Sequence, residues 1–159
     1  ISTAAGVFRY VPPTTPQGAW DVTCLLVQPT SDIVATDFDG DCKLEILTFS
    51  KFHGDTLAIW HEGQTRDRYE QVWCDPQKRS FLHALWAADL NGEKCAVIGN
   101  RKDGRDLLLV RYVDGEYTVD VIDHDLGPAN CMVYRHDGSD YIVAAYRETD
   151  QLALYKVVE

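Results

Sequence analysis

The chain lacks a surplus of basic residues. Lys and Arg total 15 against 25 Asp and Glu, which gives a net charge of −10. A protein that binds nucleic acid needs a basic surface to displace the counterions of the phosphates, and an anionic membrane attracts the same kind of surface. The charge balance therefore predicts that neither nucleic acid nor an anionic membrane is a partner.

Long apolar segments are also missing. No apolar run approaches the ~20 residues that a transmembrane helix requires, so we expect no membrane insertion. The chain begins with Ile1, and its single methionine is Met132. This start fits a processed product, a tag-trimmed protein or a fragment, and a signal peptide that had been removed would leave no trace.

Several chemical signatures are absent. The five cysteines are odd in number and form no CxxC pair, which argues against a zinc site of the cysteine-rich type and against a dense disulfide framework. We expect most of them to be small buried residues. No GxSxG, GxGxxG or phosphate-binding P-loop occurs. The sequence therefore gives no positive sign of an enzyme.

What the chain does contain is a series of short apolar runs separated by Asp, Gly and Asn turns. This pattern, with almost no helical periodicity, predicts an all-β fold. The runs also resemble one another: Asp55–Trp60 matches Asp106–Arg111 and Asp150–Tyr155. Such spacing, roughly 45 to 50 residues, indicates a repeat architecture.

Each full repeat contains four expected strands. First strands are expected at 32–36, 81–88 and 129–134, second strands at 44–49, 96–99 and 141–145, and fourth strands at 68–73 and 116–122. Two further strands, at 6–11 and 20–26, precede the repeats. Four antiparallel strands per unit are typical of a β-propeller blade. We therefore expect one propeller or partial propeller domain over 1–159, with approximate units 1–30 (two leading strands), 31–80, 81–128 and 129–159.

Three blades are too few to close a ring, since propellers typically have four to eight. An open array would expose strand edges that invite aggregation. We therefore expect either a homodimer that closes a ring of roughly six blades or an assembly with missing blades supplied by a larger propeller.

The most specific segment is the loop Asp37–Glu45, with the sequence Asp-Phe-Asp-Gly-Asp-Cys-Lys-Leu-Glu. It places carboxylates at loop positions 1, 3, 5 and 9, which is the spacing that a hard cation such as Ca²⁺ requires, and its glycine permits the sharp turn. Carboxylates at alternate positions repel one another without a counter-ion. The loop predicts a calcium site; Mg²⁺ fits less well because it prefers a smaller octahedron. The alternative is a solvated, Asp-rich hairpin turn.

The unit from Ile33 to Leu47 resembles the FG-GAP/VCBS repeat of integrin-α-like β-propellers, in which a DxDGDxxxD loop between the first and second strands binds calcium. Cys42 stands where that family usually has glycine, and Glu45 replaces the last aspartate. The resemblance implies a Ca²⁺ site formed by the side chains of Asp37, Asp39, Asp41 and Glu45 and by the backbone carbonyl of Lys43.

Two later loops are degraded copies of this one. The segment Asp89–Ala96 keeps Asp89 and Asn91 but has no closing carboxylate, so we expect a structural turn there, with a weak ion site as the alternative. The third copy has Arg135 at the position of the first ligand, where it would repel a cation.

The histidines show no HxH or HExxH spacing; they are His53, His61, His83, His124 and His136. His83 begins an expected first strand, and it is the candidate for a catalytic or metal-binding role in a central channel. An ordinary polar residue is the other interpretation. The short strand that it begins is similar to His-led strands in the propellers of large carbohydrate-active lyases.

These features support two functional hypotheses. The first is a noncatalytic, calcium-stabilised binding or scaffold module that recognises a protein or carbohydrate ligand. The alternative is the propeller part of a carbohydrate-active lyase or hydrolase with a channel site near His83. A fragment without autonomous activity is a third possibility. The calcium motif favours an extracellular location and the cysteine usage opposes it, so the compartment stays open.

Overall fold

The computed structural model describes residues 1–51 and 54–158. His53, one of the candidate histidines, lies outside the described residues. The described chain is built of fourteen β-strands and one 3₁₀ turn, Arg147–Thr149, and contains no α-helix. The predicted all-β class is therefore confirmed.

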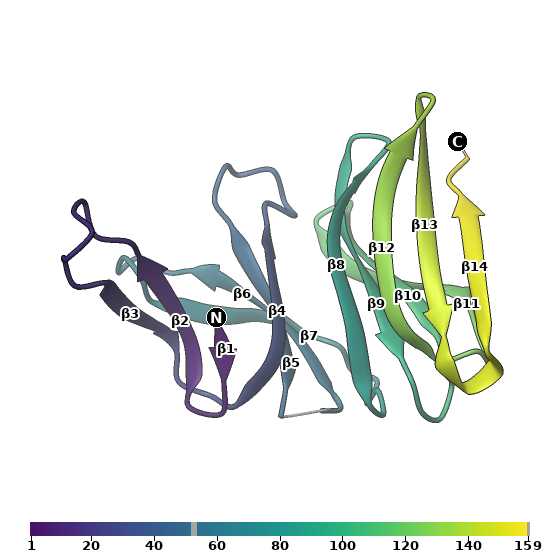
Figure 1. The fold of residues 1–159 in the computed structure, drawn as a ribbon, viewed down its shortest axis with the longest axis horizontal. Helices are drawn as coiled ribbons and strands as arrows, with labels where there is room; N and C mark the ends of the chain where they lie inside the picture. The colour runs from purple at the N-terminus through teal and green to yellow at the C-terminus, as the bar shows by residue number, and fades with distance from the viewer. Residues whose placement is uncertain (52–53, 159) are drawn as a thin grey trace.

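The strands form four antiparallel sheets (Figure 1). The first sheet contains β1 (Ser2–Thr3), β2 (Gly6–Val11) and β3 (Asp21–Leu26). The second contains β4 (Thr30–Thr36), β5 (Glu45–Ser50), β6 (Thr56–Glu62) and β7 (Tyr69–Cys74). The third contains β8 (Leu82–Leu90), β9 (Glu93–Asn100), β10 (Leu107–Val113) and β11 (Glu116–Asp123). The fourth contains β12 (Pro128–His136), β13 (Ser139–Tyr146) and β14 (Gln151–Lys156).

In every sheet the strands are neighbours in chain order, and no sheet closes on itself within the described residues. The expected four-strand units are present, but the leading unit has three strands. The sequence pattern missed β1, because two residues are too few to show a period of alternation.

Tight hairpin turns explain why β8 and β12 run beyond their expected ends. Asn91 and Gly92 connect β8 to β9 with φ of 52° and 90°, and Asp137 and Gly138 connect β12 to β13 with φ of 47° and 76°. Two successive residues with positive φ match the turn that suits the twist of a two-residue hairpin. In the second sheet the connection between the first two strands, β4 and β5, is longer than these two-residue turns, and it contains the acidic loop.

The core lies between the sheets. Phe49 and Leu57 of the second sheet pack with Ile98 and Leu108 of the third. A second cluster joins the third sheet to the fourth, and a third cluster joins the first sheet to the second. The middle strands are therefore covered on both faces, and this explains why their sequences are continuously apolar rather than alternating.

The first strands of the last three sheets lie beside one another: β4 contacts β8, and β8 contacts β12 (Figure 1). By contrast, the fourth strands β7 and β11 are largely exposed or half-buried.

Candidate metal centre

The acidic loop between β4 and β5 is held by its own first carboxylate. Asp37 Oδ1 accepts a hydrogen bond from the Gly40 amide (2.8 Å), and Asp37 Oδ2 accepts one from the Cys42 amide (3.1 Å). Gly40 and Cys42 both have positive φ, 78° and 68°, so the chain turns sharply twice. Phe38 is buried in the core between the second and third sheets and anchors the loop from below.

The next three carboxylates each use one oxygen to accept a backbone amide. Asp39 Oδ1 accepts from the Asp41 amide (3.1 Å), and Asp41 Oδ1 accepts from the Lys43 amide (2.8 Å). Glu45 Oε2 accepts from the Phe38 amide (2.7 Å). The loop backbone therefore fixes each carboxylate through one oxygen and leaves the other oxygen of the group available for another partner.

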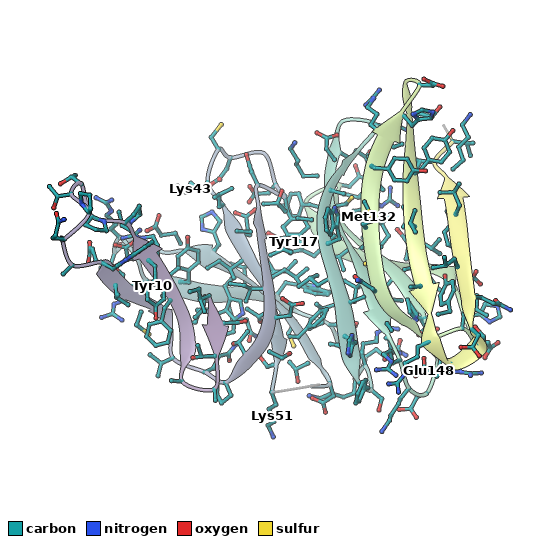
Figure 2. All side chains as sticks on the ribbon, in the orientation of Figure 1. Tyr10, Lys43, Lys51, Tyr117, Met132 and Glu148 are labelled. Carbon is teal, nitrogen blue, oxygen red and sulfur yellow. The ribbon has the colours of Figure 1, made fainter. Side chains whose placement is uncertain are left out.

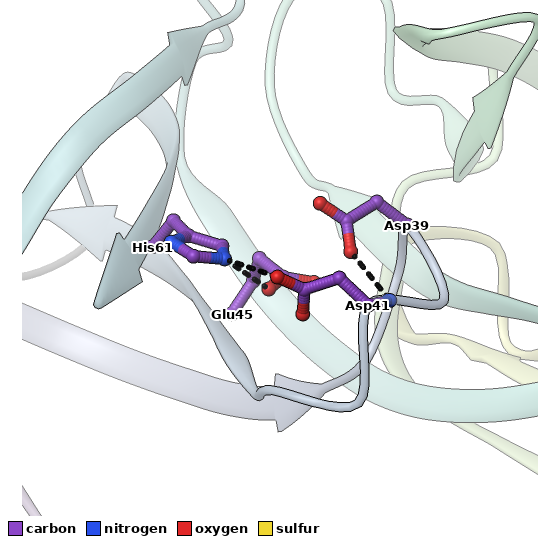
Figure 3. Close-up of side chains that lie close together, drawn as sticks. All are labelled: Asp39, Asp41, Glu45 and His61. Carbon is purple, nitrogen blue, oxygen red and sulfur yellow. Dashed lines mark hydrogen bonds and ion pairs between the residues drawn. The ribbon is translucent and has the colours of Figure 1, made fainter. Parts of the chain in front are cut away.

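These three carboxylates meet a histidine from a different strand. One ligand atom from each of Asp39, Asp41, Glu45 and His61 can be chosen so that all four lie within 4.8 Å of one another (Figure 3). Such a cluster could bind a metal ion. His61 belongs to β6, and because the register pairs Ile46 with Trp60, it lies across the hairpin from Glu45. The sequence analysis missed His61 as a possible ligand, because the strand pattern assigned no register to the pairing of β5 with β6.

The His61 ring is oriented by contacts at both nitrogens. Nδ1 lies 2.8 Å from the carbonyl oxygen of Glu62, and Nε2 lies 3.1 Å from Asp41 Oδ2 and 3.7 Å from Glu45 Oε1. A carbonyl oxygen can only accept, so Nδ1 carries a hydrogen. Burial lowers the pKa of His61, but the hydrogen bonds to Asp41 and Glu62 and the nearby negative charges outweigh it, and the net pKa is raised.

Glu45 is the buried member of the cluster. Its side chain is 0 % exposed, and within the described chain its Oε1 has no hydrogen-bond partner. Burial raises the pKa of Glu45, the Phe38 amide and His61 oppose this, and the charges of Asp39 and Asp41 add to it. A buried carboxylate oxygen without a partner is costly. It is the position in this loop where a cation would be most stabilising.

The structure therefore brings together three of the four predicted side-chain ligands. Asp37 is not in the cluster, because both of its oxygens bind the loop backbone. The Lys43 ammonium lies 3.7 Å from Asp41 Oδ2. Ligation by Asp37 and by the Lys43 carbonyl stays a prediction.

The second loop has a different arrangement. Asp89 accepts the Gly92 amide (2.8 Å) with one oxygen and the Lys94 ammonium (2.7 Å) with the other. The backbone amide of Asn91 donates a hydrogen bond to Asp140 Oδ2 (2.9 Å). The Lys94 ammonium therefore neutralises Asp89 in this turn, and the choice between a structural turn and a weak ion site stays open. In the third loop Arg135 lies 3.6 Å from Asp140.

His83 lies where β8 approaches β12, far from the acidic loop in the sequence. Its Nδ1 donates a hydrogen bond to the Ala129 carbonyl oxygen (2.9 Å), and its ring stacks on Phe81 with centroids 5.9 Å apart. These contacts give His83 a role in joining the third and fourth sheets. Its catalytic or channel role stays a prediction.

A cavity of about 560 Å³ adjoins the acidic cluster. Tyr117 of β11 points into the space between the second and third sheets (Figure 2) and packs edge-on against Phe38 with ring centroids 6.0 Å apart. The cavity is lined by Asp39, His61, Val72, Trp73, Tyr112, Gly115, Glu116 and Tyr117. Two of these residues, Asp39 and His61, also belong to the cluster.

The cysteines are all free, and only Cys95 and Cys131 are buried. The prediction that most of the five are buried is therefore wrong: Cys42 lies in the solvent-facing acidic loop, and Cys74 lies on the outer strand β7, where most side chains are exposed.

Comparison with protein-family models, with curated proteins and with solved structures finds no match to this chain. The described part of the chain also contains no helix with the length and apolar character of a membrane span.

Proposed function

We propose that this chain is a cation-stabilised β-propeller module that binds a protein or carbohydrate ligand. The observation that carries the proposal is the buried Glu45 carboxylate, whose Oε1 has no hydrogen-bond partner among the described residues and faces a cluster with Asp39, Asp41 and His61. A bound cation would compensate the buried charge and tie the β4–β5 loop to β6. Taken alone, the spacing of the carboxylates in the loop favours Ca²⁺, which binds oxygen ligands.

The arrangement of the sheets supports the propeller part of the proposal. Four antiparallel sheets pack against one another in chain order, and the first strands of three of them are neighbours. Among the described residues the fourth sheet has three strands with β14 at its edge, and Leu152 and Leu154 on β14 are exposed. A further sheet, from a second copy or from a longer chain, would cover these exposed leucine side chains and the free edge of β14.

The cavity beside the cluster supports ligand binding. Trp73, Tyr112 and Tyr117 provide aromatic surface, while Asp39 and His61 provide hydrogen-bonding groups. Aromatic faces with a few polar groups suit the recognition of a sugar ring. A cation in the cluster would fix Asp39 and His61 and so shape one wall of the cavity.

The proposal is tested first by removing and restoring cations. Thermal unfolding is measured after EDTA treatment and again with added Ca²⁺, Mg²⁺, Mn²⁺ or Zn²⁺. A cation present at a hundred times its Kd stabilises the fold by about 2.7 kcal/mol, which corresponds to a rise in Tm of about 5–10 °C. The double variant Asp39→Asn/Glu45→Gln should lose this response.

Asp137→Asn serves as the matched control. Asp137 occupies, in the third and degraded loop, the position that Asp39 has in the acidic loop, and its side chain is 88 % exposed. It should respond to cations like the wild type. If no divalent cation raises Tm, or if the double variant responds equally, the cation site is refuted.

Ligand binding is tested separately by screening glycans against the protein with cation and with EDTA. Light scattering after size-exclusion chromatography measures assembly against the 17.9 kDa of one chain. A mass near twice that value supports ring closure by a second copy, whereas a monomer means that any closing sheets lie in other chains or in a longer chain. A glycan that binds only with cation supports the module; binding unaffected by cation removal contradicts the link between the cluster and the cavity.

A further inference from the structure

The cluster contains a ligand that the loop pattern did not include. Ca²⁺ is bound almost entirely by oxygen atoms, whereas imidazole nitrogen favours transition ions such as Zn²⁺. His61 presents Nε2 to the same small space as the carboxylates of Asp41 and Glu45, at 3.1 Å and 3.7 Å (Figure 3). The donor set is therefore three carboxylates and one imidazole rather than an all-oxygen cage.

The orientation of His61 matches that of a metal ligand. Because Nδ1–H donates to the Glu62 carbonyl oxygen (2.8 Å), the lone pair of the neutral ring lies at Nε2, on the side of the carboxylates. A hydrogen bond from the far ring nitrogen to a carbonyl is the usual means by which proteins fix the tautomer and the orientation of a metal-binding histidine. Without a cation or a proton, Nε2 and Asp41 Oδ2 would face each other as two acceptors.

Within a cluster whose donor atoms all lie within 4.8 Å of one another, the distances from His61 Nε2 to two carboxylate oxygens also suit a small ion. Ligands at about 2.0–2.2 Å from zinc lie about 3.3–3.6 Å apart in a tetrahedron. The two distances from His61 Nε2, 3.1 Å and 3.7 Å, bracket this range. One donor, Glu45 Oε1, is fully buried and has no hydrogen-bond partner in the described chain, which points to a ligand independently of the acidic composition of the loop.

We propose that Asp39, Asp41, Glu45 and His61 form a mixed nitrogen–oxygen site for a divalent transition cation of the Zn²⁺ type, with His61 as a direct ligand. The inference rests on the cation site of the proposed function and specifies which ion it takes. The ion would join the β4–β5 loop to β6 and would lie beside the cavity that Asp39 and His61 also line.

The test compares ion selectivity with and without the imidazole. Affinities for Zn²⁺, Co²⁺ and Ca²⁺ are measured by calorimetry in the wild type, in His61→Gln and in the control His136→Gln, which removes an exposed histidine that also lies beside an aspartate (3.3 Å). All three proteins, including the wild-type reference, carry Cys42→Gly as a common background, because the exposed Cys42 thiol in the same loop would otherwise compete for soft ions. The φ of 68° at position 42 suits glycine.

We expect His61→Gln to weaken Zn²⁺ and Co²⁺ binding by at least about 100-fold, more than the loss of an outer partner of a ligand, while Ca²⁺ affinity changes by less than about 10-fold because glutamine offers an oxygen. His136→Gln should match the wild type. The visible absorption of bound Co²⁺ should change in shape and intensity in His61→Gln, since it reports directly on the donor atoms.

The outcomes separate this inference from the proposed function. If Ca²⁺ binds at the cluster and His61→Gln leaves Zn²⁺ affinity unchanged, the cation site stands and the role of His61 as a ligand is wrong. If His61→Gln folds less stably but no ion binds to the wild type, His61 itself is the counter-charge of the cluster, and both proposals fail.

Discussion

Replacement of Arg79 by methionine tests how the second and third sheets are held together. The Arg79 Nε lies 2.9 Å from Asp75 Oδ2, and its Nη1 lies 3.5 Å from Asp106 Oδ2. Asp75 follows β7 and Asp106 precedes β10, so one guanidinium joins the two sheets. The three side chains are 7 %, 3 % and 11 % exposed, in the order Arg79, Asp75, Asp106, which makes this a buried ion-pair network rather than a surface pair.

Methionine keeps most of the apolar stem of arginine but removes the charge. Two carboxylates then remain in a nearly dry space without a cation. Removal of one partner of a buried ion pair costs about 3–5 kcal/mol, because the remaining charge is left uncompensated. In a domain of this size such a loss lowers Tm by about 6–20 °C.

The assay is equilibrium unfolding in urea, followed by tryptophan fluorescence. Arg66→Met is the matched control, because Arg66 lies 3.9 Å from Asp67 but is 86 % exposed; surface pairs contribute about 0–1 kcal/mol. The double variant Arg79→Met/Asp75→Asn should be less destabilised than the sum of its single variants, since the two groups interact directly. The reasoning is refuted if Arg79→Met and Arg66→Met unfold at the same urea concentration.

Three further predictions concern packing and chemistry elsewhere. Gly99→Ala should destabilise the fold by about 1–3 kcal/mol in a urea melt, because a Cβ at Gly99 would lie 2.4 Å from the carbonyl oxygen of the first residue of β12; wild-type stability would contradict this close approach. Tyr155→Phe should cost about 1–3 kcal/mol, since the Tyr155 hydroxyl donates to Asp123 across the third and fourth sheets, and an unchanged thermal melt would argue against that bond. Burial raises the pKa of the Cys95 and Cys131 thiols to about 12; both therefore stay protonated at pH 8 and should react with a thiol reagent only after unfolding, and mass mapping that finds either one labelled in the native protein would refute their burial.

Much of the local structure followed from the sequence, because local rules govern it. Continuous apolar runs predicted the middle strands, and Asp-Gly or Asn-Gly pairs marked the two-residue turns, where only residues that tolerate positive φ fit well. The acidic loop was recognised for the same reason, because its pattern of carboxylates at alternate positions with a glycine among them is contained within nine consecutive residues. Three of its four carboxylates, Asp39, Asp41 and Glu45, converge as the spacing predicted.

Other features were not readable from local pattern. The short strand β1 has no alternation to detect. The exposure of Cys74 depends on which face of the outer strand it occupies, and that of Cys42 depends on how the acidic loop projects into solvent. Asp37, which the loop spacing placed among the ligands, accepts two amides of its own loop, and its ligation of an ion stays a prediction. Hydrogen bonds within a turn compete with ion binding for the same oxygens, and spacing alone does not say which wins.

By itself, the sequence determined the all-β class, the order of the strands and the acidic character of one loop, since each depends on neighbouring residues. Tertiary structure alone decided that His61 stands beside that loop, because the pairing of β5 with β6 brings residues of distant sequence position to one point. It also decided that Glu45 is buried with an oxygen that lacks a hydrogen-bond partner among the described residues, since burial depends on the packing of whole sheets.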